Sequence, residues 1–509
     1  MHGTKLRLNK GAAGGAFADD IMEVIMNYKM MGRFIGKMLI VEAVFMVPAL
    51  VISLFEGERS SVMAFLVSIA AIAVSAAGLL LIGRGSKNKF YAREGLVCVG
   101  LSWAILSLLG CLPFYFSGAI PNFVDAFFEI VSGFTTTGAS ILPEIEGLPK
   151  GILYWRSFSH WLGGMGVLVF LLAITSAGGG DNGFTMHLLR AESPGPNVGK
   201  LVPKMRKTAR ILYELYILLT VINVIFLLAG GMPMFEAVCT AFGTAGTGGF
   251  GIKNDSIAGY SPYIQNVCTV FMLLFGVNFT CYYLLLLKQF KNVFRDEELR
   301  LYLGVAAASV LLITWNLRGF YPTLRETLRH AAFQVSSIMT TTGYATTDFD
   351  LWPTFSKVIL FSLMIVGASA GSTGGGFKCG RVLLVIKSLR RSVRQVIHPE
   401  KVQVVRSNGH PVDEKVLQNT NAYLAAYAII TLLSFILISV DGFSMTTNLS
   451  AVMACFNNIG PGFESVGPTC NFSGFSSFSK IVLILDMLAG RLEIFPILIL
   501  FSRSTWKRR

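Results

Sequence analysis

The sequence has little charge for its length. Only 14% of its 509 residues are Asp, Glu, Lys or Arg, whereas soluble proteins carry about 25%. Hydrophobic residues make up 53% of the chain and the mean hydropathy is +0.61, which excludes an ordinary soluble protein. Apolar runs at Met38–Phe55, Ser61–Ile82 and Ile481–Phe501 reach or approach the roughly 20 residues that cross a bilayer. We therefore expect a protein with many membrane spans.

The sequence also lacks the signatures of metal sites, catalysis and secretion. Its eight cysteines contain no CxxC pair and its six histidines are scattered, so no zinc-type cluster is expected. The cysteines lie mostly in apolar segments and are interpreted as small buried hydrophobic residues. No nucleophile is accompanied by a base, so we expect neither an enzyme nor a cofactor bound to this chain. Met1–Lys37 is basic and contains acids and glycines, unlike a cleaved signal peptide.

The charge that is present follows a pattern. The formal net charge is +14, and basic residues gather in alternate connections between apolar runs, while the intervening connections carry more acids. The positive-inside rule produces this alternation. We therefore expect a multi-pass membrane protein with both termini in the cytoplasm, and no nucleic-acid partner. The basic clusters are Arg84, Lys87, Lys89 and Arg93; Arg190, Lys200, Lys204, Arg206, Lys207 and Arg210; Lys288, Lys291, Arg295 and Arg300; and the run Lys378–Arg406.

Four segments repeat one plan, in which an apolar stretch too short to span a bilayer is followed by a turn rich in Thr and Gly. A longer apolar run precedes and follows each of them. Aligned on their central glycines, the segments place Gly138, Gly248, Gly343 and Gly460 in equivalent positions. One such turn is common, but four at matching positions indicate an internal repeat. The segments are Ala126–Ser140, Glu236–Gly251, Ala331–Thr346 and Leu449–Glu464.

The longer apolar runs are expected to be transmembrane helices, because a helix satisfies its own backbone groups in lipid. The predicted fold is an all-α polytopic membrane protein. Four repeats of helix, pore loop and helix surround one pore, and two extra transmembrane helices, near residues 34–56 and 61–83, precede them. The helices flanking the loops are Gly95–Phe116, Tyr154–Thr175, Ile211–Leu228, Tyr263–Leu287, Leu301–Trp315, Phe355–Val366 continuing at Arg381–Ile386, Tyr423–Val440 and Ile481–Phe501.

The repeats divide the chain into six parts. Residues 1–33 are expected to form an N-terminal cytoplasmic segment, and residues 34–84 the two extra transmembrane helices. The repeats then occupy residues 85–189, 190–295, 296–405 and 406–509.

The Thr/Gly-rich turns point to a pore. Irregular backbone at membrane depth is tolerated only where it is buried in protein or lines water. Glycine permits backbone conformations that bring carbonyl groups close to an axis. In potassium filters, rings of such carbonyls replace the hydration shell of the ion. We therefore expect the four loops of this single chain to line one cation-selective filter.

At these loops the sequence resembles the Trk/Ktr/HKT superfamily of cation transporters, and within it the TrkH-type membrane subunits of bacterial Trk potassium uptake systems. The resemblance covers about residues 34–503 and includes HWLGGMGVLVF (His160–Phe170), ESPGP (Glu192–Pro196), GSTGGGFK (Gly371–Lys378) and GRLEIF (Gly490–Phe495). It implies potassium uptake across the bacterial inner membrane, with potassium as the transported ligand. It also implies a homodimer in contact with membrane lipid. A cytosolic ring of regulatory subunits would bind the nucleotide, either ATP/ADP or NAD.

The resemblance also implies which residues form the filter. Only the glycine is shared by all four loops of the family. In plant relatives, serine at the first filter glycine goes with sodium transport, so Gly138 favours potassium, with a sodium or mixed-cation transporter of the same fold as the alternative. The implied filter residues are Thr136, Thr137 and Gly138; Gly246, Thr247 and Gly248; Thr341, Thr342 and Gly343; and Asn458, Ile459 and Gly460.

Two features are expected to form a gate below the filter. The many small residues of Gly367–Lys378 cannot hold a rigid helix, and the resemblance implies an intramembrane loop that blocks or opens the pore. The string is not a phosphate-binding loop, because Phe377 stands where such a loop has lysine. Arg491 is a charge inside an apolar run, and such charges usually face water; the matching arginine of the family projects into the pore. The predicted gate residues are Gly371, Ser372, Thr373, Gly374, Gly375, Gly376 and Arg491.

Three alternatives stay open at the level of sequence. Arg491 can instead form a purely structural ion pair with Glu493 or Asp486. Glu129 and Glu464 either attract cations to the outer mouth or are solvated or helix-capping acids. A secondary transporter of an organic solute would also contain Gly-rich breaks in its helices, but it would have two related, typically inverted halves rather than four parallel repeats.

Overall fold

The computed structural model describes residues 26–85, 92–164, 166 and 205–506. This part of the chain is mostly helical, and its two strands, β1 (Arg406–Ser407) and β2 (His410–Pro411), pair as one short antiparallel hairpin. The prediction of an all-α protein is therefore confirmed. Most of the predicted segment 1–33 lies outside the described residues, as do the ESPGP string and the predicted boundary between the first two repeats.

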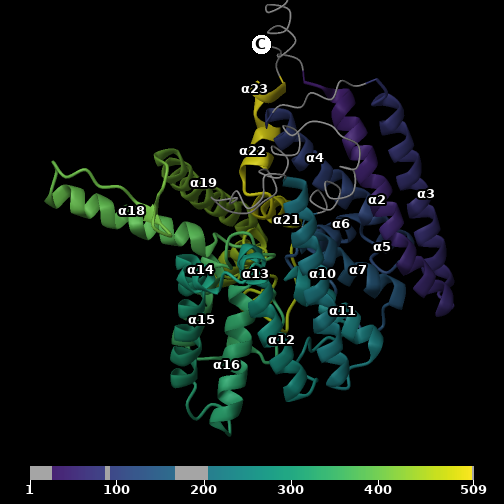
Figure 1. Cartoon of the computed structure of the whole chain (residues 1–509). Coiled ribbons are helices and arrows are strands. Elements are labelled where there is room, and N and C mark those ends of the chain that lie inside the picture. Colours follow the sequence, from purple (N-terminus) through teal and green to yellow (C-terminus); the bar gives the residue numbers. More distant parts are fainter. Residues whose placement is uncertain (1–25, 86–91, 165, 167–204, 507–509) are drawn as a thin grey trace, which may run out of the picture.

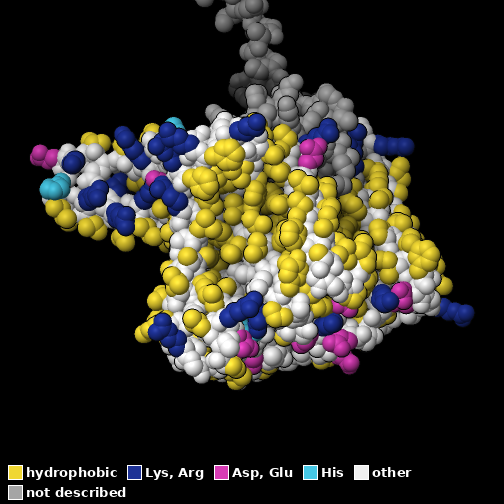
Figure 2. Space-filling model, turned by 60° about the horizontal axis from the view of Figure 1, so that its bottom comes forward, with side chains coloured by type: hydrophobic (Ala, Val, Ile, Leu, Met, Phe, Trp, Pro, Cys, Tyr) yellow, Lys and Arg dark blue, Asp and Glu magenta, His cyan; other side chains and the backbone are white. Residues whose placement is uncertain are grey.

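Six of the described helices are long and apolar enough to cross a membrane, or seven if the bent pair of α12 and α13 counts as one span. On the face that Figure 2 shows, a wide band of hydrophobic side chains lies between two rims that carry charged residues. The six helices are the two predicted extra spans and the first helix of each repeat. They are α2 (Tyr28–Phe55), α3 (Arg59–Ile82), α4 (Ala92–Gly110) with α5 (Leu112–Phe116), α10 (Met205–Ala229), α15 (Glu297–Asn316) and α19 (Glu414–Ile438).

Four shorter helices lead into the Thr/Gly-rich turns and are called pore helices here. Three of them begin where a polar side chain accepts hydrogen bonds from backbone N–H groups of the first turn, at Asn122, Thr323 and Ser444, which is the usual stabilisation of a helix N-terminus. None of the four is long enough to span a bilayer. The pore helices are α6 (Phe123–Phe134), α11 (Met234–Gly246), α16 (Leu324–Met339) and α20 (Met445–Phe456).

The second helix of the third repeat agrees with the sequence prediction, and that of the first repeat can be followed only in part. In the third repeat the predicted break is present, because Gly367–Lys378 separates α17 (Thr354–Val366) from α18 (Cys379–Ile397). The first helix of this kind, α7 (Lys150–Gly164), corresponds to the predicted Tyr154–Thr175, whose last residues lie outside the described part of the chain.

Two predicted continuous helices are broken, so these predictions were wrong. Tyr263–Leu287 is divided into α12 (Pro262–Phe275) and α13 (Phe279–Leu286), which are bent by 87° relative to each other. Ile481–Phe501 is divided into α21 (Ser477–Arg491) and α22 (Phe495–Phe501). Glu493 and Ile494 lie between the last two helices with φ of 62° and 65°, and left-handed backbone cannot continue a right-handed helix.

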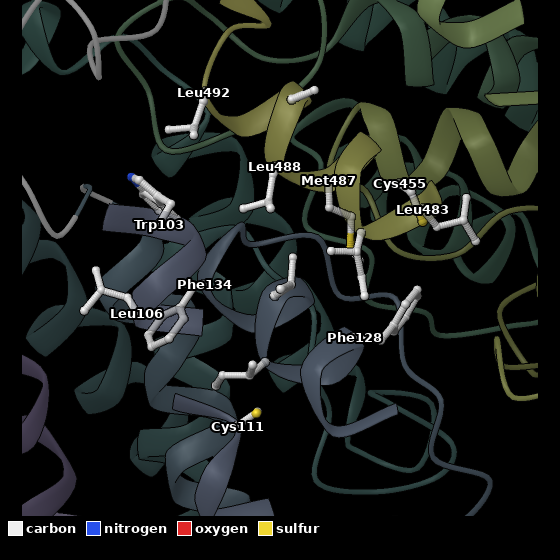
Figure 3. Close-up of a cluster of buried hydrophobic side chains, with 14 of the residues drawn as sticks. Trp103, Leu106, Cys111, Phe128, Phe134, Cys455, Leu483, Met487, Leu488 and Leu492 are labelled. Atoms are coloured by element: carbon white, nitrogen blue, oxygen red, sulfur yellow. The ribbon is translucent and has the colours of Figure 1, made fainter. Parts of the chain in front are cut away.

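The repeats surround a common centre, and the first packs against the fourth. Figure 3 shows side chains of α4 and α6 in one buried cluster with side chains of α20 and α21. In that cluster Phe128, Cys455, Leu483 and Met487 are all less than 4% exposed. The helices α2 and α3 lie together at the outer edge of the first repeat (Figure 1). The core thus joins the two ends of the described chain into one bundle.

One helix departs from the bundle. In Figure 1, α18 projects sideways from the body, and the β1–β2 hairpin follows it. The remaining short elements are α14 (Phe290–Arg295), α23 (Arg503–Trp506) and the 3-10 turns η1 (Phe349–Leu351), η2 (Ser439–Asp441) and η3 (Glu464–Val466).

Candidate functional site

The four turns after the pore helices have the same backbone conformation. In each, the first residue has a left-handed φ between 55° and 59°, and a glycine two positions later also has positive φ. The residue between them donates its N–H over 2.8 Å to the carbonyl oxygen five positions earlier. The matching triplets are Thr136–Thr137–Gly138, Thr247–Gly248–Gly249, Thr341–Thr342–Gly343 and Asn458–Ile459–Gly460.

This conformation corrects the sequence alignment of the second turn by one residue. Gly249, with φ of 77°, is the equivalent of Gly138, and Gly248 is the equivalent of Thr137. Gly246 is the last residue of α11 and therefore lies outside the triplet. Two consecutive glycines made both alignments possible in the sequence, and only the backbone φ separates them.

The four triplets form a closed ring. A Cβ atom built on the glycine of each would lie within 2.8 Å of the carbonyl oxygen of the middle residue in the next triplet. Real Cβ atoms do not approach other atoms so closely, so each of these positions requires glycine. The pairs run through the repeats in order and return to the first: Gly138 with Gly248 (2.0 Å), Gly249 with Thr342 (1.9 Å), Gly343 with Ile459 (2.1 Å) and Gly460 with Thr137 (2.8 Å).

A cavity of about 170 Å³ lies on the glycine side of this ring, and it is called the vestibule here. All four ring glycines line it, which places them at one mouth of a single opening. The other lining residues are those that follow the triplets and those of the neighbouring connections: Ala139, Ser140, Leu142, Pro143, Ile145, Arg156, Phe250, Gly251, Lys253, Asn254, Ser256, Ala345, Pro461, Val466, Gly467, Pro468, Thr469, Cys470, Asn471 and Phe472.

Hydrogen bonds of buried polar side chains stabilise the ring. The hydroxyl of Thr137 lies 2.7 Å from that of Thr135, and the carboxamide nitrogen of Asn458 donates to Thr137 over 2.9 Å. The same Asn458 nitrogen donates over 3.0 Å to the carbonyl oxygen of Met487 in α21. These bonds tie the first and fourth triplets together and to a helix, which restricts how far the ring can open.

His160 links the first and second turns, and no function was assigned to it from the sequence. Its Nε2 accepts the N–H of Phe250 over 3.2 Å, and its Nδ1 lies 2.8 Å from the carbonyl oxygen of Gly133. Because Nε2 accepts, the proton must be on Nδ1, and the ring is neutral with both nitrogens satisfied. A Cβ on Gly248 would lie 2.2 Å from this imidazole, so the second turn packs directly against it.

The loop Gly367–Lys378 packs against the other side of the ring. The N–H of Gly375 donates over 2.5 Å to the hydroxyl of Thr341, the first residue of the third triplet. A Cβ on Gly375 would lie 2.3 Å from the carbonyl oxygen of Asn457, just before the fourth triplet. Since the vestibule lies at the glycine end of the triplets, this loop lies at their opposite end.

The same loop contacts the break between α12 and α13. The N–H of Ser369 donates over 3.1 Å to the carbonyl oxygen of Gly276, and the N–H of Phe279 donates over 3.0 Å to that of Gly371. The hydroxyl of Thr373 donates over 3.2 Å to the carbonyl oxygen of Phe275. The broken helices of the second and third repeats thus meet beneath the ring.

Arg491 connects this loop to the first repeat. Its guanidinium donates over 2.9 Å to the carbonyl oxygen of Thr373, over 2.8 Å to that of Gly164, and also to that of Gly163. The acids that could have formed an ion pair with it have other partners: Glu493 pairs with Arg381, and Asp486 accepts from Ser434 over 2.7 Å. The structure therefore brings the predicted gate residues together, with Arg491 bound to backbone carbonyls.

Two basic residues at the C-terminal end of the loop belong to the predicted cluster Lys378–Arg406 but were not among the predicted gate residues. Lys378 is buried and donates to the carbonyl oxygen of Gly374, four positions earlier in the same loop. Arg381 lies over the ring of Tyr423, with its guanidinium carbon 4.0 Å from the ring centroid. Lys378 directly follows the GSTGGGF string, so the sequence could have indicated a role in the loop. Its partner is a backbone atom, which the sequence does not identify.

The contacts of Glu129 and Glu464 distinguish attraction of cations from a structural role. Glu129 is fully buried, pairs with Arg156 over 2.6 Å and accepts the N–H of Ile141, so it is a structural anion. Glu464 accepts from the hydroxyls of Ser444 and Thr447 at the start of α20. The hydrogen bond from Ser444 holds the pKa of Glu464 below its ordinary value, and this acid stabilises a helix terminus.

Metal coordination by acidic, histidine or cysteine side chains does not enter this arrangement. Among the residues that the structure describes, no group of three or more His, Cys, Asp or Glu side chains could hold a metal ion. What the site offers instead is a ring of backbone carbonyl oxygens, which are ligands for weakly hydrated monovalent cations.

The chain is similar to known cation transport proteins. A family model described as TrkH, cation transport protein, matches residues 61–319 and 321–508. The Trk system potassium uptake protein TrkH of Salmonella typhimurium is 35% identical over 493 residues, covering 95% of this chain and 100% of that protein. TrkG of Escherichia coli, also described as a Trk system potassium uptake protein, is 31% identical and covers 91% and 95%. The crystal structure of the potassium transporter TrkH from Vibrio parahaemolyticus superposes with a TM-score of 0.84 at 30% identity, covering 95% of this chain and all of that one.

Proposed function

Because the chain belongs to the TrkH family of cation transport proteins, we propose that it takes up potassium across the bacterial inner membrane through a gated, ion-selective pore. The closed ring of four glycine turns carries this proposal. Its carbonyl oxygens come from one chain, so the ring is assembled by folding alone. Such oxygens replace the water around a potassium ion without adding a fixed charge that would hold the ion too tightly to leave.

The filter consists of the four triplets in the register that the backbone defines. Gly138, Gly249, Gly343 and Gly460 allow adjacent loops to approach each other closely. The middle residues, Thr137, Gly248, Thr342 and Ile459, supply the carbonyl oxygens that these glycines face. The first residues turn the chain from the pore helix into the ring by their left-handed backbone.

The gate consists of Gly371–Gly376 and Arg491. The loop lies against the end of the filter opposite the vestibule, so it occupies the route that an ion would take after the filter. Arg491 places a positive charge on the same side and holds Thr373 and the end of α7 together. Releasing these bonds would let the loop move and would open the path.

Potassium is favoured over sodium as the transported ion because Gly138 is glycine. A serine side chain there would meet the carbonyl oxygen of Gly248 and deform the ring. The test is growth rescue of a potassium-uptake-deficient bacterium at low potassium, repeated with an excess of sodium. We expect rescue that sodium does not suppress. Rescue abolished by sodium would favour the sodium or mixed-cation alternative, and no rescue by a correctly inserted protein would contradict the proposal.

A cytosolic partner would dock on α18. This helix projects from the body (Figure 1) and exposes apolar side chains, including Leu389, Val393 and Val396 at 63%, 53% and 81%. Arg390, Arg391 and Arg394 of the same helix are basic. We propose a ring of regulatory subunits that binds ATP/ADP or NAD, while this chain forms a homodimer in the lipid with both termini in the cytoplasm.

The partner proposal has its own test. Leu389→Ser combined with Val393→Ser should reduce co-purification of the regulator, whereas Leu324→Ser, a matched change at a residue 66% exposed on α16, should not. Nucleotide should change rubidium flux only when the regulator is present. Full co-purification of the double variant, or flux that does not change with nucleotide in the complex, would contradict the proposed regulatory partner.

A further inference from the structure

The vestibule of this proposed cation pore is lined by positive rather than negative charge. Its charged lining residues are Arg156 and Lys253, and of the described residues that line it none is acidic. An acid-lined mouth is the usual way to concentrate cations. The carboxylates of three acids accept hydrogen bonds from lining residues without lining the vestibule themselves: Glu146 accepts the N–H of Asn254, Glu129 accepts from Ser140 and Arg156, and Asp348 accepts from Thr469.

The two basic residues are held in the same way. The guanidinium of Arg156 lies 3.6 Å above the ring of Phe250 and pairs with Glu129 of the pore helix α6. The ammonium of Lys253 lies 4.3 Å above the ring of Tyr260. Each cation thus rests on an aromatic face, while an acid from a pore helix lies behind it.

Lys253 differs from Arg156 in exposure. Its acid, Glu236 of α11, lies 3.7 Å away and is also bonded over 2.6 Å by the hydroxyl of Tyr260. The side chain of Lys253 is 36% exposed, whereas that of Arg156 is 2% exposed. Arg156 is therefore a buried structural cation, and Lys253 is the cation whose field reaches the water of the vestibule.

We infer that Lys253 is a specificity-determining residue that disfavours divalent cations at the mouth of the pore. The inference rests on the proposed function, since it concerns ions that approach the filter. The energy of an ion in a given potential is proportional to its charge. A positive potential that lowers the local concentration of potassium by some factor therefore lowers that of a divalent cation by the square of that factor. The filter would be shielded from divalent ions that carbonyl oxygens could hold too tightly.

The test compares Lys253→Gln with the parent protein in liposomes. Rubidium uptake at low ionic strength and its inhibition by Mg²⁺ are measured with the vestibule side exposed. At low ionic strength we expect uptake at subsaturating rubidium to rise by about two- to tenfold, as expected for a charge near a cleft. The apparent Mg²⁺ affinity should rise by about the square of that factor. Lys253→Arg should resemble the parent. Lys150→Gln removes another outer lysine, paired with Glu56 over 2.8 Å but outside the vestibule, and should change neither quantity.

A native thiol provides a second readout without altering Lys253. Cys470 lines the vestibule and is exposed, while the other seven cysteines are buried. A negatively charged methanethiosulfonate at Cys470 should raise uptake and Mg²⁺ affinity, and a positively charged one should lower both, with Cys470→Ser insensitive to either. Parent protein that conducts rubidium with Mg²⁺ inhibition unchanged in Lys253→Gln would overturn the inference. Parent protein that conducts no rubidium would instead contradict the proposed function.

Discussion

A Cβ atom built on Gly138 would lie 2.0 Å from the carbonyl oxygen of Gly248 in the next repeat. The glycine also has φ of 80°, where any side chain is strained by roughly 1–3 kcal/mol. Two independent constraints therefore meet at this residue. One is set by the local backbone and the other by a neighbouring turn 110 residues away in sequence.

Gly138→Ser should lower the selectivity for potassium over sodium, because the serine side chain must push the first and second turns apart. We expect the permeability ratio to fall by about tenfold, which corresponds to ~1.4 kcal/mol. Gly231→Ser is the matched control, since Gly231 has φ of 82° and nothing within 4 Å of its built Cβ. The ratio is measured from reversal potentials, and equal ratios in parent and Gly138→Ser would remove Gly138 from the filter.

The corrected register of the second turn gives a separate prediction. Gly249→Ala should reduce selectivity as changes at Gly138 do, because its Cβ would meet the carbonyl oxygen of Thr342. Gly248→Ala should act differently, since its Cβ would meet the buried ring of His160. We expect loss of folded protein for Gly248→Ala and altered selectivity in the folded fraction of Gly249→Ala. The opposite assignment of the two effects would restore the register that the sequence alone suggested.

Arg491→Ala should conduct faster at saturating potassium. A unit charge about 4 Å from a passing cation costs roughly 4 kcal/mol at an effective dielectric constant near 20, and ions and water in the pore screen part of this. We therefore expect flux to rise about tenfold, or ~1.4 kcal/mol. Arg491→Lys should fall between parent and alanine, because an ammonium keeps the charge but cannot reproduce the bonds of the guanidinium to three carbonyl groups.

The control for this series is Arg59→Ala, at an exposed residue that begins α3. Folded yield and flux are measured for all four proteins. Normal yield with unchanged flux in Arg491→Ala would contradict a role in the barrier, and poor yield alone would indicate a structural role.

Shortening the loop Gly371–Gly376 should raise basal flux while selectivity is kept. The loop touches the filter through the bond from Gly375 to the hydroxyl of Thr341, but it contributes none of the ring carbonyls. Removal of two or three glycines should therefore prevent the loop from blocking the pore and leave the filter intact. Flux without a regulator and the potassium-to-sodium ratio are the two measurements. A folded deletion variant with the parent's basal flux would show that the loop is not a gate.

Glu129→Ala should destabilise the protein. It leaves the guanidinium of Arg156 buried without its carboxylate, and breaking a buried pair from one side costs about 3–5 kcal/mol. The double variant Glu129→Ala/Arg156→Ala should recover part of this loss, because no unpaired charge remains. Thermal unfolding in detergent measures both. A stable Glu129→Ala protein with reduced affinity for potassium would instead support cation attraction by this acid.

The four-fold arrangement of the loops could be predicted from the sequence because glycine spacing and apolar runs repeat together. The register of the second turn could not, since Gly248 and Gly249 are chemically identical. Choosing between them requires the φ of each residue and the contact of Gly249 with Thr342. Both are consequences of packing between repeats rather than of local composition.

The breaks between α12 and α13 and between α21 and α22 were also not predicted from the sequence. Asn278 lies at the first break, and Glu493 and Pro496 lie at the second. The flanking runs are nevertheless hydrophobic enough for each to be interpreted as one span. The chain bends there because backbone groups bind partners in other repeats, as the carbonyl oxygen of Gly276 does with the N–H of Ser369. The contacts of Arg491 could not be predicted for the same reason, because its carbonyl partners belong to two other repeats.

The central claim is that the ring of four turns conducts potassium by itself. Its most direct test is rubidium uptake into liposomes that contain only the purified chain, with potassium trapped inside and no organic solute present. We predict uptake that unlabelled potassium competes away, that a tenfold excess of sodium does not, and that loses this discrimination in Gly138→Ser. Uptake that requires an organic solute, or no uptake by correctly inserted protein, would contradict the account.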